Sequence, residues 1–200
     1  MMRRTVLAIV EGRGEVSAVP ELVRRIAGEV SPELVVEVPR PIRVPRNKIV
    51  KEGELERAVM LASYKAGIDG CVLVLLDADR DCPAELAPQL LARAATASPG
   101  RDIRAVLAKT EYEAWFLAAA GSLAGRRGLD ETLAPPDNPE AIQDAKGWLS
   151  ARMPRGRRYR ETLDQAALTA TFDMAVARRL SPSFDKLWRD VSGLLQPPQV

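Results

Sequence analysis

The sequence predicts an α/β fold, in which helices flank a parallel sheet and an all-helical extension follows. Continuous apolar runs such as Cys71–Leu76 are typical of strands that are buried on both faces, as in a parallel sheet. Between these runs apolar residues recur at helical spacing, so strands and helices alternate up to about residue 120. We therefore expect an α/β domain over residues 1–120 and a helical extension over residues 121–200 that packs on it.

The hydrophobic pattern places the individual elements. Strands are predicted at Thr5–Val10, Leu34–Val38, Cys71–Leu76 and Ile103–Ala108. Helices are predicted over Val16–Val30 (with Pro20 tolerated in its first turn), Glu54–Ala66, Pro83–Ala97, Glu111–Ala120, Asn138–Arg152, Asp164–Arg179 and Ser183–Leu195. The Pro- and Arg-rich stretch Pro39–Lys51 is expected to be irregular or an edge strand, and the basic segment 153–161 to be irregular.

The composition excludes several kinds of chemistry. The 200 residues include no histidine, which rules out Ser-His-Asp and Cys-His catalysis and His-ligated zinc, haem or non-haem iron. Acid–base catalysis must then use carboxylates, Lys, Tyr or metal-bound water. Cys71 and Cys82 form no CxxC pair, so we expect reduced thiols in a cytoplasmic protein and no zinc or redox motif.

The lengths of the apolar runs indicate whether the chain could enter or cross a membrane. The first run, Val6–Val10, ends at Glu11 and is too short for a signal peptide, and no later run could span a bilayer. We therefore expect a cytoplasmic protein without a membrane partner. The net charge of +2 neither requires nor excludes a nucleic-acid partner.

Two acidic clusters follow predicted strands directly. Glu11 and Glu15 follow the first strand, and Asp77, Asp79 and Asp81 follow the strand at Cys71–Leu76. Open α/β sheets bind ligands at the C-terminal edge of their strands. Carboxylates crowded at such an edge repel each other, and a hard cation such as Mg²⁺ would relieve the repulsion. The sequence thus predicts a metal-dependent phosphate site.

The individual carboxylates differ in how well a structural role explains them. If the strand continues through Asp77 and Asp79, both side chains lie on one face and can share a metal. Asp81 either joins them or caps the helix that begins near Pro83. Glu15 has either a functional role or a favourable interaction with a helix dipole.

The segment Gly12–Ser17 lies between a strand and a helix, where a dinucleotide-binding turn would lie. Carboxylates at Glu11 and Glu15 disfavour a bound pyrophosphate there, so a dinucleotide-dependent enzyme ranks last among the hypotheses.

Glu111 and Glu113 form a second tier of candidates. The stretch TEYE, which begins at Thr110, matches a capping box, in which Glu113 would bond back to the Thr110 N–H. This structural role explains Glu113 better than it explains Glu111.

A basic stretch further along the chain, RMPRGRRYR, has an aromatic residue among its arginines. Four of these arginines are candidates for nucleic-acid contacts: Arg155, Arg157, Arg158 and Arg160. The alternative is a solvated surface loop. Upstream of this stretch, Lys146 could supply a positive charge near a phosphate.

These residues resemble a known pattern, in which a strand ends in Glu-Gly and a later strand ends in Asp-x-Asp. It is the pattern of the Toprim fold, a Rossmann-like sheet found in bacterial primases, topoisomerases and OLD-type nucleases. The chain more specifically resembles a bacterial family of Toprim-like proteins of unknown function. The segments that match are IVEGRGE, LLDADRD, EYEAWFLA, NPEAIQDAKGWL, RYRETLDQ and SPSFDKL.

The Toprim resemblance implies roles for several residues. Glu11 would be the general acid or base, and Asp77 and Asp79 would hold Mg²⁺ or Mn²⁺. Lys146 would be the counterpart of the catalytic Lys that OLD-type nucleases use. By analogy of fold, the resemblance also implies a nuclease that acts in phage defence or DNA repair.

Two hypotheses of different classes therefore lead. The first is a Mg²⁺-dependent phosphoryl-transfer enzyme, a nuclease acting on nucleic acid, with Glu11 and Glu15 completing the metal site. The second is a binding or regulatory partner of an ATPase, in which the acidic site is catalytically idle.

Overall fold

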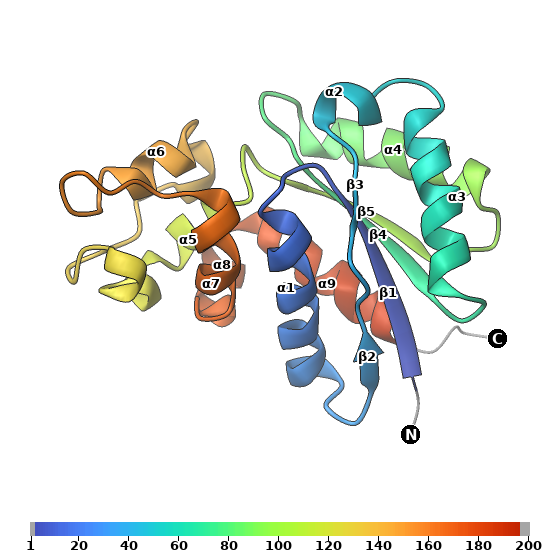
Figure 1. Cartoon of the computed structure of the whole chain (residues 1–200), viewed down its shortest axis with the longest axis horizontal. Coiled ribbons are helices and arrows are strands. Elements are labelled where there is room, and N and C mark those ends of the chain that lie inside the picture. Colours follow the sequence, from blue (N-terminus) through green and yellow to red (C-terminus); the bar gives the residue numbers. More distant parts are fainter. Residues whose placement is uncertain (1–2, 197–200) are drawn as a thin grey trace.

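The computed structural model describes residues 3–196 and confirms the predicted α/β fold (Figure 1). Within these residues five strands form one parallel sheet: β1 (Arg3–Val10), β2 (Val35–Glu37), β3 (Ile42–Arg43), β4 (Cys71–Asp77) and β5 (Ile103–Ala108). The order is β2-β1-β4-β5, and the short β3 pairs with the end of β1 on the same side as β2. The C-terminal ends of β1, β4 and β5 therefore meet at one edge of the sheet.

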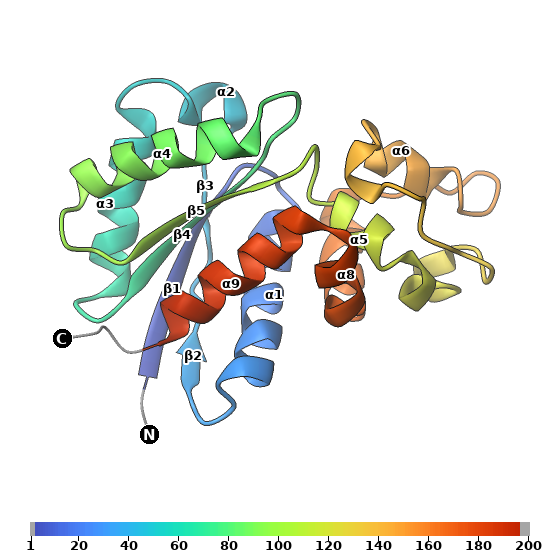
Figure 2. The ribbon, with the colours of Figure 1, turned by 180° about the vertical axis from the view of Figure 1, so that it is seen from behind.

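Helices cover both faces of this sheet. On one face lie α1 (Glu15–Val30) and α9 (Pro182–Leu195), and on the other lie α3 (Glu54–Ala66) and α4 (Pro83–Ala97), as Figures 1 and 2 show. Side chains alternate between the two layers, so that Val6 and Ala8 pack toward α1 whereas Leu7 and Ile9 pack toward α3. Because both faces are buried, the strands are continuously apolar.

The periodic elements of the first 110 residues match their predicted bounds closely. The bounds of α3, α4 and β5 are those predicted from the sequence. Pro20 lies inside α1, beyond the first turn where it was expected. The Pro- and Arg-rich segment contains the edge strand β3 and a short helix, α2 (Arg46–Ile49).

Short helices after β5 form a lobe beside the sheet, on the left in Figure 1. They are α5 (Ala114–Ala118), α6 (Ala145–Ser150), α7 (Ala166–Thr169) and α8 (Met174–Leu180), with 3₁₀ turns at 120–123, 126–128 and 139–141 and a π-helical turn at Glu161–Gln165.

The long helices predicted for this lobe were wrong. The helix predicted over Asn138–Arg152 begins only at Ala145, because Asp144 caps it by accepting the Gly147 N–H at 2.7 Å. The helix predicted over Asp164–Arg179 is interrupted before Asp173, which caps α8 by accepting the Val176 N–H at 2.9 Å. Each local cap starts a new helix.

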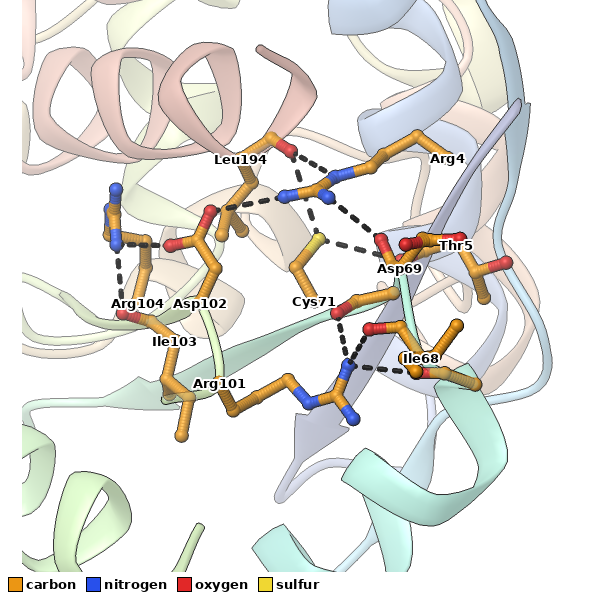
Figure 3. A network of polar contacts seen from close by, with 12 residues as sticks. Arg4, Thr5, Ile68, Asp69, Cys71, Arg101, Asp102, Ile103, Arg104 and Leu194 are labelled. Atoms are coloured by element: carbon orange, nitrogen blue, oxygen red, sulfur yellow. Dashed lines mark hydrogen bonds and ion pairs between the residues drawn. The ribbon is translucent and has the colours of Figure 1, made fainter. Parts of the chain in front are cut away.

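The helix α9 returns from this lobe to the sheet. Its last turn is held by Arg4, whose Nε donates to the Leu194 carbonyl at 2.8 Å (Figure 3). The same guanidinium donates to the Asp69 carbonyl at 2.7 Å and to Asp102 Oδ2 at 3.1 Å. Residues 121–196 are thus divided between the lobe and a helix of the main α/β layer.

No helix among residues 3–196 combines the length and the apolar character needed to cross a bilayer.

Candidate functional site

The C-terminal edge of the sheet brings together carboxylates from three strands. Glu11 follows β1, Asp77 is the last residue of β4, and Glu111 and Glu113 lie in the turn after β5. Since β4 pairs with both β1 and β5, these side chains converge although they are far apart in sequence. We call Glu11, Glu15, Asp77, Glu111 and Glu113 the carboxylate cluster.

Glu15 stabilises the turn between β1 and α1. Its Oε2 accepts the backbone N–H groups of Glu11 and Gly12, both at 3.1 Å, and the residue is 3% exposed. Burial raises the pKa of Glu15 to about 8, with further contributions from the charges of Glu11 and Glu113 and an opposing one from the two N–H donors. Glu15 therefore organises the turn, and it lies at the first position of α1, where a negative charge is favourable.

Glu11 has unused capacity to bind a ligand. Its Oε2 atom is buried and accepts no hydrogen bond within the described residues. Burial raises the pKa of Glu11 to about 7, against the opposing charge of Arg46 and together with the charge of Asp79. Arg46, on α2, was not identified from the sequence, because it lies in the stretch expected to be irregular.

The strand does not continue through Asp77 and Asp79, which was the condition for both side chains to lie on one face. β4 ends at Asp77, and Asp79 adopts a left-handed conformation, with φ of 50°, which turns the chain away from the strand. Asp77 is 7% exposed and accepts the Tyr112 N–H at 2.7 Å, whereas the Asp79 side chain is exposed. Burial raises the pKa of Asp77 well above its ordinary value, and the charges of Glu15 and Glu113 raise it further.

Glu113 is the most deeply buried carboxylate of the cluster, with 0% exposure, and it does not form a capping box. Thr110 has a φ of 67°, outside the extended conformation that an N-cap requires, and α5 begins only at Ala114. The Glu113 Oε1 atom instead accepts the Tyr159 hydroxyl at 2.7 Å and the Gln165 amide at 3.1 Å. Burial raises the pKa of Glu113, while Lys146 and the Tyr159 hydrogen bond oppose that rise.

Lys146 lies within the carboxylate cluster. Its Nζ is 3.1 Å from Glu111 Oε1 and 3.2 Å from Glu113 Oε2, and its backbone N–H donates to Glu111 Oε2 at 3.2 Å. Burial by itself lowers the pKa of Lys146, but Glu113, Asp77 and Glu111 raise it above the ordinary value. The ammonium group therefore stays charged.

Asp81 lies at the rim of the site. The predicted cap on α4 is not formed, because Cys82 occupies the N-cap position and provides no side-chain hydrogen bond. Asp81 pairs with Arg46 instead. Beside this pair, a cavity of about 400 Å³ is lined by Asp79, Arg80, Asp81, Thr110, Glu111 and Gln143.

The chemistry of the cluster fits a hard divalent cation. Carboxylate oxygens are the ligands that Mg²⁺ prefers, and the buried Glu11 Oε2 accepts no hydrogen bond in the part of the chain that the structure describes. No three acidic or thiol side chains among residues 3–196 form a ready-made set of metal ligands. Mg²⁺ commonly uses one or two carboxylates, with waters and substrate phosphates filling the remaining positions, so a closed set is not required.

The four arginines predicted to contact nucleic acid lie on the loop around Tyr159, with Arg160 directly after it. Arg157 pairs with the buried Asp164, at 3.7 Å between Nη2 and Oδ1. Arg155, Arg158 and Arg160 are exposed.

Sequence reasoning missed Tyr159 and Gln165, the two donors to Glu113. The available signal was the segment RYRETLDQ, which holds both residues and overlaps the end of the basic stretch. Gln165 also explains a glycine of the first turn, because a Cβ atom on Gly14 would lie 2.3 Å from Gln165 Oε1 and 2.6 Å from the Glu161 carbonyl oxygen. The lobe fills the space beside Gly14, where a dinucleotide would have to approach.

Comparisons with known proteins give a family and one remote likeness. The model of a family described as "Domain of unknown function (DUF4276)" matches residues 10–192. No curated protein matches the chain. Among solved structures, the fold is similar to the C-terminal region of the Burkholderia pseudomallei OLD protein, with 14% identity, a TM-score of 0.39, and coverage of 96% of this chain and 98% of that chain.

Proposed function

The chain belongs to the DUF4276 family, a domain of unknown function, and we propose that it is a nuclease that hydrolyses phosphodiester bonds with Mg²⁺ or Mn²⁺. The observation that carries this proposal is the convergence of carboxylates at the ends of three parallel strands at one sheet edge, where Glu11 Oε2 accepts no hydrogen bond from residues 3–196. Buried carboxyl groups with strongly raised pKa values are concentrated at functional sites. The Toprim resemblance of the same residues supports the same reaction.

In this proposal one or two of the carboxylates of Glu11, Asp77 and Asp79 would ligate the cation, with waters and substrate phosphate at the remaining positions. Glu15 would complete the site by fixing the turn that carries Glu11. When bound, the metal would polarise the phosphate and lower the pKa of a coordinated water. Glu11 has a pKa of about 7, so it can accept or donate a proton near neutral pH.

Lys146 would stabilise negative charge that develops on the reacting phosphate. Its ammonium is held by Glu111 and Glu113, which fix its position before any substrate binds. Tyr159 and Gln165 would in turn hold Glu113 in place.

A second candidate function is a binding or regulatory partner of an ATPase with a catalytically idle site. One observation favours it. Lys146 already neutralises part of the carboxylate cluster, and no three acidic or thiol side chains of residues 3–196 form a set of metal ligands.

The Asp77→Asn variant tests the two candidates. The Asn side-chain oxygen can still accept the Tyr112 N–H, so the fold should persist while Mn²⁺ binding weakens and metal-dependent cleavage of DNA or RNA is lost. Calorimetry with Mn²⁺ and a cleavage assay would measure the two effects. The matched control is Asp137→Asn, which removes an exposed carboxylate from a loop of the lobe and should change neither. Cleavage by Asp77→Asn at the wild-type rate would sink the assignment, and wild-type protein without Mn²⁺ binding or turnover would favour the ATPase partner.

A further inference from the structure

A second polar cavity, of about 700 Å³, lies in the lobe and is lined by the chain segment that also reaches the carboxylate cluster. We call it the arginine cavity; it is lined by Arg127, Gly156, Arg157, Arg158, Arg160 and Asp164. Four guanidinium groups here face a single carboxylate, so the cavity carries a net positive charge. Arg127 comes from a different part of the lobe and was not among the arginines that the sequence indicated.

Asp164 holds the arginines of this cavity in place. It is 3% exposed, and its Oδ1 accepts Nε and Nη2 of Arg127 at 3.1 and 3.0 Å. Arg157 Nη2 lies 3.7 Å from the same oxygen, while Oδ2 accepts the Arg160 backbone N–H at 3.0 Å. One buried carboxylate thus orients two guanidinium groups and anchors the backbone of a third arginine.

The backbone at Arg127 and Gly128 leaves space for the guanidinium group of Arg157. Arg127 has a φ of 51°, a conformation that costs about 1 kcal/mol or more for a non-glycine residue. Gly128 follows with a φ of 80°, and a Cβ atom there would lie 2.6 Å from Arg157 Nη1. The absence of a side chain at Gly128 therefore makes room for Arg157 beside Arg127.

The cavity retains unused hydrogen-bond donors. Within residues 3–196 the guanidinium groups of Arg158 and Arg160 make no hydrogen bond or ion pair, and that of Arg157 makes only its long contact to Asp164. Each guanidinium carries five N–H donors in a planar fork that matches the oxygens of a phosphate group. Several such forks around one concave space suit a phosphate better than a carboxylate, which offers fewer oxygens.

One segment of chain connects the arginine cavity to the carboxylate cluster. Tyr159, between Arg158 and Arg160, is buried and donates to Glu113 at 2.7 Å. Gln165, next to Asp164, donates to the same Glu113 oxygen at 3.1 Å. Residues that line the cavity are thus direct neighbours in the chain of residues that hold Glu113. Adjacent Cα atoms are about 3.8 Å apart, so the backbones that carry the two sets lie close together.

We propose that the arginine cavity binds one phosphate group of the substrate, next to the phosphate that reacts at the carboxylate cluster. The identification of the ligand as nucleic acid rests on the proposed function, whereas the phosphate chemistry of the cavity does not. The phosphate is either the terminal group of a strand or an internal backbone group.

The test is a binding titration in EDTA, in which no metal-dependent step takes part. The probes are two fluorescent single-stranded oligonucleotides, one ending in a 5′-phosphate and one in a 5′-hydroxyl, read by anisotropy. Arg127→Gln and Arg158→Gln remove groups of the cavity, and among residues 3–196 the Arg158 side chain forms no hydrogen bond or ion pair whose loss could destabilise the fold. Arg3→Gln is the matched control, since Arg3 is an exposed arginine at the opposite edge of the sheet and does not line the cavity.

We expect both cavity variants to bind about tenfold more weakly, and the control to stay within about threefold of wild type. A loss confined to the 5′-phosphate probe identifies a strand end, and an equal loss for both probes identifies an internal phosphate. Equal affinities of Arg158→Gln and Arg3→Gln would overturn the proposal.

The same titration separates this proposal from the proposed function. Asp77→Asn should bind both probes at least as tightly as wild type in EDTA, because it keeps every arginine of the cavity and removes only a carboxylate from the site. If Asp77→Asn also retained cleavage while Arg158→Gln bound weakly, the cavity would stand and the nuclease assignment would fall.

Discussion

The Glu15 side chain accepts two backbone N–H groups best when it is charged, yet its burial disfavours the charged form. Its pKa of about 8 lies above the ordinary value of 4.5. The folded protein therefore binds a proton more tightly than the unfolded chain does. The raised pKa values of Glu11, Asp77 and Glu113 act in the same direction.

The sign of the resulting pH dependence follows directly. Between about pH 5 and pH 8 the folded state holds more protons, so the free energy of unfolding should fall as the pH rises. A tenfold difference in proton affinity between the folded and unfolded states corresponds to about 1.4 kcal/mol. In EDTA, we expect the free energy of unfolding of the wild-type protein, measured by denaturant titration, to fall by several kcal/mol from pH 5 to pH 8. Glu15→Gln, which keeps an acceptor for the Glu11 and Gly12 N–H groups, should show a clearly smaller loss.

Glu11 keeps its raised pKa of about 7 in the Glu15→Gln variant, so its own titration still lowers the free energy of unfolding as the pH rises. A residual pH dependence in Glu15→Gln is therefore expected. A wild-type free energy of unfolding that stayed constant or rose from pH 5 to pH 8 would contradict the assigned pKa directions.

At the scale of single elements, the cap on α6 positions Lys146. Asp144 accepts the Gly147 N–H at 2.7 Å, and Lys146 lies in the helical turn that this bond closes. We expect Asp144→Ala to lower the free energy of unfolding by about 1 kcal/mol, the usual effect of losing an N-cap. Displacing Lys146 from Glu111 and Glu113 should also slow metal-dependent cleavage.

Asp173→Ala is the matched control for this experiment. Asp173 caps α8 with the same geometry, accepting the Val176 N–H at 2.9 Å, but α8 contributes no residue to the carboxylate cluster. Denaturant unfolding should show similar losses in the two variants, whereas cleavage should slow in Asp144→Ala alone. Equal cleavage rates would contradict a role for the α6 cap in the site.

The elements differ in how well the sequence predicts them. The sheet and its helices were predictable, because the strands are continuously apolar and each helix has one apolar face whose period is visible in the sequence, as for α3 and α4. The short helices of the lobe were not, because they begin and end at local caps such as Asp144 and are too short for a period to show.

The same contrast explains which site residues could be predicted. Glu11 and Asp77 follow strongly apolar strands, so their place at the sheet edge could be inferred from the sequence alone. Glu113 was assigned to a capping box because TEYE fits that pattern, and the left-handed turn at Thr110 that prevents it has no sequence signal. Tyr159 and Gln165 reach Glu113 only through the packing of the lobe, with sequence separations of 46 and 52 residues.

At the scale of the whole molecule, Arg4 links the start of the sheet to its last covering helix. The Arg4→Met variant would leave the Leu194 and Asp69 carbonyls without their partner and remove the guanidinium from Asp102 (Figure 3). We expect a loss of about 3 kcal/mol in the free energy of unfolding, measured by denaturant titration.

The neighbouring Arg3→Met variant is the control for that loss. Arg3 forms an exposed ion pair with Glu37, so its removal should change stability by less than about 0.5 kcal/mol. Mn²⁺ affinity should be unchanged in both variants, because these arginines lie at the edge of the sheet opposite the carboxylate cluster. Similar stabilities of the two variants would show that the Arg4 contacts contribute little.

The Arg4–Leu194 hydrogen bond joins residues 190 positions apart, and this span has a consequence for how the protein folds during synthesis. α9 leaves the ribosome after every strand of the sheet, so the part of the sheet face that α9 covers beside α1 stays exposed until then. A nascent chain in this state exposes the side chains that α9 later buries, which makes it a natural client for chaperones. Completion of the fold is then governed by the arrival of a single late helix, and pairing of such distant segments is intrinsically slow.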